Sequence, residues 1–157
     1  MLFRTNVQCM ELDALDHAII RNLRADGRLT NVALAERVGL TPAPCLRRMH
    51  RLEAEGAIRG YQAVVNPEAL GQGFEVFLEI DLTDFARGSI DAFEAAMAGF
   101  EEVVELHRLF GTPDYLARVA TSGTEAYEAF LTNHVLTIPG ISRVSSRFAM
   151  KTLKSLR

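Results

Sequence analysis

Apolar residues in the first third of the chain recur in short runs with the 3.6-residue period of an α-helix. The first run predicts a helix that Asp13 caps and Gly27 ends, with apolar positions at Leu15, Ala18, Ile19 and Leu23. The second run predicts a shorter helix that Thr30 caps and Gly39 ends, with an apolar face made of Leu34, Ala35 and Val38.

A third helix is predicted directly afterwards, with Thr41 as its cap and Gly56 at its end. Pro42 takes its first position, where the missing N–H has no helical partner to lose. At helical spacing, the residues that should face the core are Cys45, Met49 and Leu52. The opposite face would then present Thr41, Ala43, Leu46, Arg47, His50 and Arg51, with Arg48 at its boundary.

The second half of the chain alternates between strand and helix patterns. In residues 74–82, apolar residues at every second position from Phe74 to Leu82 alternate with Glu75, Glu79 and Asp81, which predicts a half-buried strand with one charged face. A helix capped by Ser89 and ended by Gly99 should follow, then strands over 103–110 and 115–121, a helix from Thr124 to Pro139-Gly140, and a last strand over 141–153. This β-α-β-β-α-β order is typical of a ferredoxin-like sandwich, with two helices on one face of a four-stranded antiparallel sheet.

Composition is ordinary for a globular protein, since the 157 residues are 48% hydrophobic and 24% charged. No apolar run is long enough for a membrane span and the N-terminus lacks a signal-peptide core, so we expect a cytoplasmic protein with no membrane partner. The spacing of Cys9 and Cys45 suits neither a disulfide framework nor a zinc site, so we expect no metal and no cofactor.

Charge is divided unevenly between the two halves. Through Asn66 the chain has nine basic and seven acidic residues, a net charge of +2, whereas the remainder has eight basic and 13 acidic residues, a net charge of −5. From Arg37 to Leu52 there are four arginines and no acidic residue, which concentrates positive potential on one small segment.

A short helix, a tight turn containing Gly39 and a second helix with a basic outward face are typical of a helix-turn-helix motif, whose second helix enters the major groove of DNA. We predict that Arg47 and Arg51 reach into that groove. Arg37 and Arg48 are predicted to hold phosphates or structural carboxylates. The predicted DNA-binding set is completed by Thr41, Pro42, Ala43, Leu46 and His50.

These elements predict an α+β chain in four parts: an N-terminal tail (1–11), a three-helix helix-turn-helix domain (12–60), a linker strand and hinge (61–73), and a ferredoxin-like sandwich (74–157). Within the linker, the predicted strand spans 61–65 and the flexible hinge is Gly71-Gln72-Gly73.

The segment from Gly27 to Glu53 resembles the DNA-binding segment of the Lrp/AsnC family. The similarity continues through Ile58, Gly60, Tyr61, Asn66 and Pro67 and resumes in the C-terminal half, so it covers nearly the whole chain from Leu12. The resemblance implies a transcriptional regulator that binds double-stranded DNA. It also implies a C-terminal domain that senses a small effector, an amino acid, and pairs through its sheet into homodimers that assemble into tetramers or octamers.

The resemblance also indicates an effector site. A Gly-x-x-Asp-Tyr pattern at Gly111, Asp114 and Tyr115, together with Thr112 and Pro113, would line that site at an interface between subunits. Backbone N–H groups of such a turn suit an α-carboxylate and a carboxylate suits an α-ammonium. Without the resemblance, Asp114 would be expected only to close the turn. Further candidates for this site are Leu136, Thr137 and Phe148. Because Thr112 and Leu109-Phe110 depart from the family pattern, leucine does not follow as the ligand.

An enzyme is not expected, because the four histidines are scattered and neither HExxH nor GxSxG is present. One alternative is an amino-acid-binding regulatory subunit of a metabolic enzyme, which the C-terminal fold alone would permit. Another is a protein-interaction module that does not bind DNA. The acid-free segment from Arg37 to Leu52 favours the DNA-binding regulator over both.

Overall fold

The computed structural model describes residues 11–153, and the chain divides into two compact units after Ala63. The predicted N-terminal tail, including Cys9, lies almost entirely outside the described residues. No helix of the described chain is long and apolar enough to cross a membrane.

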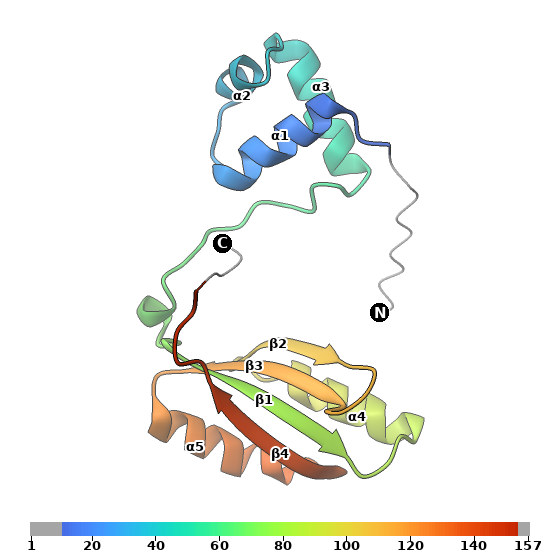
Figure 1. The fold of residues 1–157 in the computed structure, drawn as a ribbon, viewed down its shortest axis with the longest axis vertical. Coiled ribbons are helices and arrows are strands. Elements are labelled where there is room, and N and C mark those ends of the chain that lie inside the picture. Colours follow the sequence, from blue (N-terminus) through green and yellow to red (C-terminus); the bar gives the residue numbers. More distant parts are fainter. Residues whose placement is uncertain (1–10, 154–157) are drawn as a thin grey trace. The chain divides into compact units, whose positions relative to one another are not determined.

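The N-terminal unit consists of three helices, α1 (Ala14–Ala25), α2 (Asn31–Arg37) and α3 (Pro42–Ala54), as the sequence predicted (Figure 1). Asp13 caps α1 through the N–H of Asp16, and the Thr30 hydroxyl accepts the N–H of Ala33 at the start of α2. Thr41 precedes α3 without a side-chain capping bond. The three helices enclose one apolar cluster of buried residues, formed by Ile19, Leu34, Ala35, Val38, Cys45 and Leu52.

The turn between α2 and α3 depends on Gly39, whose φ of +71° is a left-handed conformation that other residues rarely adopt. The next N–H, from Leu40, bonds back to the carbonyl of Ala35 at 2.8 Å. Across the turn, Asn31 Nδ2 donates to the Pro42 carbonyl at 2.8 Å, so the start of α2 is joined directly to the start of α3. These bonds determine the angle at which α3 leaves the turn.

The C-terminal unit has the predicted β-α-β-β-α-β order. Its elements are β1 (Phe74–Leu82), α4 (Arg87–Ala98), β2 (Val103–Arg108), β3 (Tyr115–Thr121), α5 (Thr124–Asn133) and β4 (Ile141–Phe148). The strands form one antiparallel sheet in the order β2-β3-β1-β4, which confirms the ferredoxin-like sandwich.

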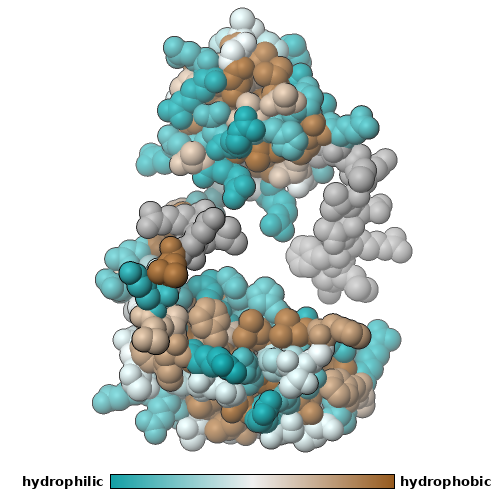
Figure 2. Space-filling view, viewed as in Figure 1, coloured by the Kyte–Doolittle hydropathy of each residue, from teal (hydrophilic) through white to brown (hydrophobic). Residues whose placement is uncertain are grey.

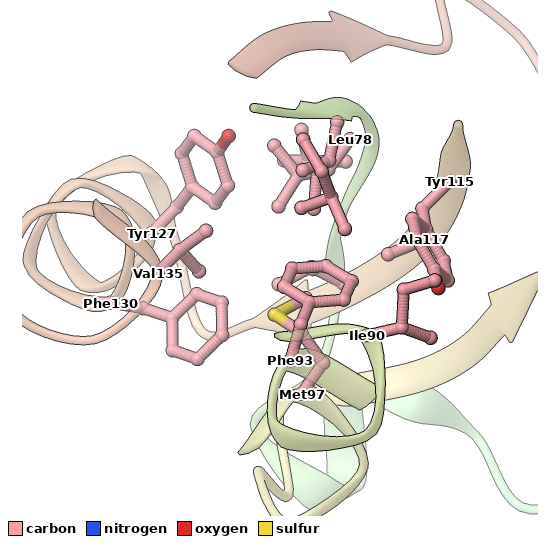
Figure 3. Packing of buried hydrophobic residues seen from close by; sticks show 13 residues of the cluster. Leu78, Ile90, Phe93, Met97, Tyr115, Ala117, Tyr127, Phe130 and Val135 are labelled. Atoms are coloured by element: carbon pink, nitrogen blue, oxygen red, sulfur yellow. The ribbon is translucent and has the colours of Figure 1, made fainter. Parts of the chain in front are cut away.

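Alternation along β1 separates the two faces of this sheet. Val76, Leu78 and Ile80 are fully buried and contact the apolar sides of α4 and α5, which lie on the same face (Figure 3). The opposite face bears ion pairs between strands, namely Arg118 with Glu75 and Glu105, Arg143 with Asp81, and Arg147 with Glu79. Figure 2 shows hydrophobic and hydrophilic residues side by side on the viewed face of this unit.

The predicted linker strand is wrong, because residues 61–66 form neither helix nor strand. A strand exists only where a neighbouring strand completes its hydrogen bonds, and the sequence pattern at 61–65 gives no information about such a neighbour. A single 3₁₀ turn (Pro67–Leu70) follows and ends at Gly71, whose φ is +67°.

Several predicted element ends are also wrong in detail. Helix α4 begins at Arg87, so Ser89 lies inside its first turn, and the Asp84 carboxylate accepts from Ala86 N and Ser89 Oγ. The hairpin strand β2 ends at Arg108, two residues early. After α5 the chain forms a separate 3₁₀ turn (Val135–Thr137), and β4 ends at Phe148 instead of Leu153.

Candidate DNA-binding helix and effector site

The orientation of α3 follows from its buried side. Cys45 and Leu52 are fully buried against α1 and α2, as their spacing predicted, and Met49 packs at the edge of the same cluster. Between Thr41 and Leu52 the exposed residues are Thr41, Pro42, Ala43, Leu46, Arg47, His50 and Arg51. The structure therefore gathers most of the predicted DNA-binding residues on the exposed side of one helix, while Arg37 lies exposed at the last position of α2.

Two arginines of α3 are held by carboxylates of α1. Arg48 Nη1 lies 2.6 Å from Asp13 Oδ2 and 2.8 Å from Asp16 Oδ1, and Arg51 Nη2 bonds to Asp16 Oδ2. Asp16 is fully buried and also accepts the N–H of Asp13. Arg48 was predicted to hold phosphates or structural carboxylates, and within one chain it bonds to carboxylates. Arg51 was predicted to enter the groove, and its Nη2 is bonded to Asp16.

Sequence reasoning missed Asp13 and Asp16 as partners of these arginines. The signal was present, because Asp16 stands three residues before the core residue Ile19 and so on the buried side of α1. A buried carboxylate requires a partner, and arginine is the most suitable one. The N–H of Asp16 and the Arg48 guanidinium together hold the pKa of Asp13 below its usual value, and both carboxylates raise the pKa of Arg48.

The predicted effector turn joins β2 to β3. Asp114 uses its carboxylate to anchor this turn to the end of β1, since Oδ2 accepts the N–H of Leu82 at 2.8 Å. The N–H of Asp114 in turn donates to Asp81 Oδ1 at 3.3 Å. The other carboxylate oxygen, Oδ1, makes no hydrogen bond within residues 11–153. Asp114 therefore closes the turn and retains an oxygen that could accept from a ligand.

Tyr115 does not offer its side chain to a ligand at this turn. Only 1% of its surface is exposed, its ring packs on Phe93 at 4.7 Å between centroids, and its hydroxyl donates to Glu94 at 2.7 Å. Burial, followed by the contact with Glu94, raises the pKa of Tyr115 to about 12. Within one chain this residue is part of the core.

The remaining effector candidates do not gather at the turn within one chain. Phe148 pairs with Val76 on β1 and its ring packs against Phe74, whereas Tyr115 pairs with Ile80. Four residues along a strand separate these positions, a distance of about 14 Å, so Phe148 belongs to the opposite end of the sheet. Leu136 is exposed in the 3₁₀ turn after α5.

Thr137 instead lines a hollow of about 550 Å³ between α4 and the end of α5. The hollow has an apolar floor at Phe93 and Phe100, and its polar lining includes Asp84 and His134. None of the residues from Gly111 to Tyr115 contributes to it.

Comparison with known proteins agrees with this division into two domains. Residues 12–53 match the family profile described as the AsnC-type helix-turn-helix domain, and residues 75–157 match the profile described as the Lrp/AsnC ligand binding domain. The chain belongs to the Lrp/AsnC family. This is a family of transcriptional regulators that combine a helix-turn-helix domain with a ligand-binding domain. A regulatory subunit of an enzyme would not require the helix-turn-helix domain.

Individual Lrp/AsnC relatives match over almost the whole chain. The leucine-responsive regulatory proteins of Salmonella typhimurium and Escherichia coli are 39% and 38% identical over 144 residues, which is 92% of this chain and 88% of theirs. Among solved structures, a transcriptional regulator from Neisseria meningitidis in complex with L-Met is 35% identical with a TM-score of 0.87. That match covers 92% of this chain and 93% of the Neisseria chain. An AsnC family regulator from Agrobacterium tumefaciens is 36% identical over 92% of this chain and 94% of its own, with a TM-score of 0.86.

Proposed function

We propose that this Lrp/AsnC protein is a sequence-specific DNA-binding regulator of transcription whose C-terminal domain responds to a small amino acid. The observation that carries the proposal is the exposed side of α3. Arg47 and His50 point away from the buried side of that helix and, within residues 11–153, make no ion pair and no side-chain hydrogen bond. They are therefore available to base edges in a major groove, which supplies acceptors for both side chains.

Gel-shift titration of an Arg47→Ala variant tests this role, with Arg24→Ala as the control for loss of one positive charge. Arg24 is exposed near the far end of α1. A bidentate contact from Arg47 to guanine would make the substitution cost about 1–3 kcal/mol of operator binding. Equal affinities of Arg47→Ala and Arg24→Ala for the operator would refute the assignment.

Two copies are needed to recognise a full operator, because one helix-turn-helix buries too little surface for tight specific binding. We propose a homodimer that pairs through the helix-free face of the sheet and assembles further into tetramers or octamers. Supporting this, Phe77 and Leu116 lie half-buried on that face between the ion pairs of neighbouring strands. Sedimentation velocity should show that Phe77→Asp dissociates the dimer, and an unchanged sedimentation coefficient would contradict the proposed interface.

The proposed effector is a small amino acid held at the β2–β3 turn where copies meet. The Neisseria relative was solved with L-Met, and the Asp114 carboxylate retains an oxygen suited to an α-ammonium group. A thermal-shift screen of the twenty amino acids should identify the ligand, since binding to the folded state raises the melting temperature. Asp114→Asn keeps an acceptor for the N–H of Leu82 but removes the charge, so calorimetry should show loss of ligand binding with DNA affinity retained. Undiminished ligand binding by this variant would exclude Asp114.

The effector would act by favouring one arrangement of subunits over another, to the extent of its differential affinity for them. The proposal includes no catalytic step, and it places the protein in the cytoplasm, with the DNA. The alternative, a regulatory subunit of a metabolic enzyme, predicts ligand binding without DNA binding and is distinguished by the same gel-shift series.

A further inference from the structure

A small hollow lies on the flank of α3 next to α1. It has a volume of about 330 Å³ and is lined by Pro44, Arg47, Arg48 and Arg51. Pro44, Arg48 and Arg51 follow one another at helical i, i+4, i+7 spacing, so the hollow runs along one stripe of the helix. A concave surface lined by three guanidinium groups attracts an anion.

Two of these guanidinium groups are oriented before any anion arrives. The buried Asp16 carboxylate accepts from Arg48 with one oxygen and from Arg51 with the other, and Asp13 binds the same Nη1 of Arg48 from the N-cap of α1. Asp13 and Asp16 are themselves joined by a reciprocal capping box, so neither carboxylate can rotate freely. A guanidinium has five N–H donors, and those not bonded to the carboxylates remain for a ligand.

Charge in the hollow remains positive despite the two carboxylates. Arg47 has no ion pair within residues 11–153, so three guanidinium groups face two carboxylates and leave a net charge of +1. A DNA phosphodiester carries a single negative charge and two acceptor oxygens, which suits two oriented guanidinium groups.

We propose that this hollow is the seat of one phosphate of the DNA backbone, and that Asp16 is a positioning residue that orients Arg48 and Arg51 for it. The inference rests on the proposed DNA binding and assigns different tasks along α3. Arg48 and Arg51 fix the position of the helix on the duplex without carrying sequence information. Arg51 has one N–H fewer for a base edge than Arg47 has, because its Nη2 is bonded to Asp16.

The substitution Asp16→Asn tests the proposal, because the direction of the change in DNA affinity distinguishes orientation of the arginines from attraction by net charge. The substitution makes the protein more positive, so attraction between net charges alone predicts tighter DNA binding, whereas loss of orientation predicts weaker binding. The probes are a duplex selected from a random library by the wild-type protein and an unselected duplex of the same length and composition. Affinities of wild type, Asp16→Asn, Arg48→Ala, Arg51→Ala and the control Arg24→Ala would be measured over a range of salt concentrations.

We expect Asp16→Asn, Arg48→Ala and Arg51→Ala to weaken binding to both duplexes equally. A lost phosphate contact should make the slope of log K against log salt shallower by up to about 0.9, which corresponds to roughly eightfold at 0.1 M salt. The ratio of affinities for the two duplexes should stay unchanged in all three, and should fall in Arg47→Ala.

Two results would overturn the proposal: a folded Asp16→Asn variant that binds as tightly as wild type or more tightly, or an Arg51→Ala variant that changes the affinity ratio with an unchanged salt slope. If circular dichroism shows that Asp16→Asn does not fold, Asp13→Asn replaces it, since asparagine caps a helix as well as aspartate does. That variant must then weaken binding to both duplexes. A wild-type protein that enriches no duplex from the random library and does not bind the unselected duplex would refute the proposed function itself.

Discussion

The hydroxyl proton of Tyr115 should make the stability of the C-terminal domain dependent on alkaline pH. This side chain is almost fully buried and donates to Glu94 at 2.7 Å, and its pKa is raised from 10.0 to about 12. A group whose pKa is higher in the folded state contributes stability below its unfolded pKa and loses that contribution as pH rises through the folded value. The window for Tyr115 is therefore pH 10 to about 12.

The substitution Tyr115→Phe removes the hydroxyl and keeps the ring that packs on Phe93. At pH 7 the variant should be less stable than the wild-type protein by about 1–2 kcal/mol, the free energy of the lost hydrogen bond to Glu94. This value is toward the lower end for a hydrogen bond to a charged group, because water can reach the partly exposed Glu94. At pH 11 the wild-type protein should have lost about 1.4 kcal/mol of its own through the raised pKa. The gap in stability between the two proteins should therefore nearly close.

Urea unfolding of the C-terminal domain, followed by far-UV circular dichroism at several values from pH 8 to pH 11, measures this gap. Comparing the two proteins cancels the titration of every other group, including Tyr61 and Tyr127. A gap that stays constant over this range would refute the reasoning, because it would show that the Tyr115 proton is held no more tightly in the folded than in the unfolded state.

Further predictions concern the stability of the N-terminal domain, with a glycine of the C-terminal domain as a control, and the pKa of Asp13. Gly39→Ala should destabilise the N-terminal domain by about 1–2 kcal/mol, because alanine is strained at φ +71°. No steric clash adds to this cost, since no atom of residues 11–153 lies within 4 Å of the added Cβ. Gly88→Ala, in the open first turn of α4, should instead stabilise its own domain by about 0.5–1 kcal/mol, and thermal unfolding that shows the same sign for both would contradict this. Because the pKa of Asp13 is lower in the folded state than its ordinary value of 3.8, the ionised carboxylate stabilises the folded domain above pH 3.8. This contribution is lost as pH falls through the pKa of the folded state. Carboxyl NMR titration should find that Arg48→Ala raises this pKa toward 3.8, and no change would contradict the pairing.

Local sequence signals predicted most of the fold. Asp13, Thr30 and Gly39 mark the limits of the first two helices because capping and left-handed turns depend on a residue and its close neighbours. The alternation along β1 predicted which face is buried for the same reason. By contrast, residues 61–65 have the residue pattern of a strand but no neighbouring strand to pair with. Strand pairing depends on distant parts of the chain, so a local pattern does not predict it.

The candidate sites were predicted less completely than the fold. The exposed side of α3 was predicted correctly because the buried side of a helix determines its exposed side, whereas contact of these residues with DNA stays a prediction. The effector candidates were not brought together in one chain, since Phe148 lies at the end of β4 that pairs with the start of β1. Antiparallel pairing determines which ends of two strands meet, and candidates chosen one by one along the sequence do not include that constraint.

The two-domain organisation, the helix-turn-helix, the ferredoxin-like order and the resemblance to the Lrp/AsnC family were all evident from the sequence, because periodicity, caps and turns act over a few residues. Which arginines of α3 have donors free for DNA depends instead on contacts between distant parts of the chain. Residues 37–52 contain no acid, yet folding places Asp13 and Asp16 against Arg48 and Arg51, about 35 positions away along the chain. Electrostatic interaction depends on distance in space, so the charge that faces DNA could not be obtained by counting along the sequence.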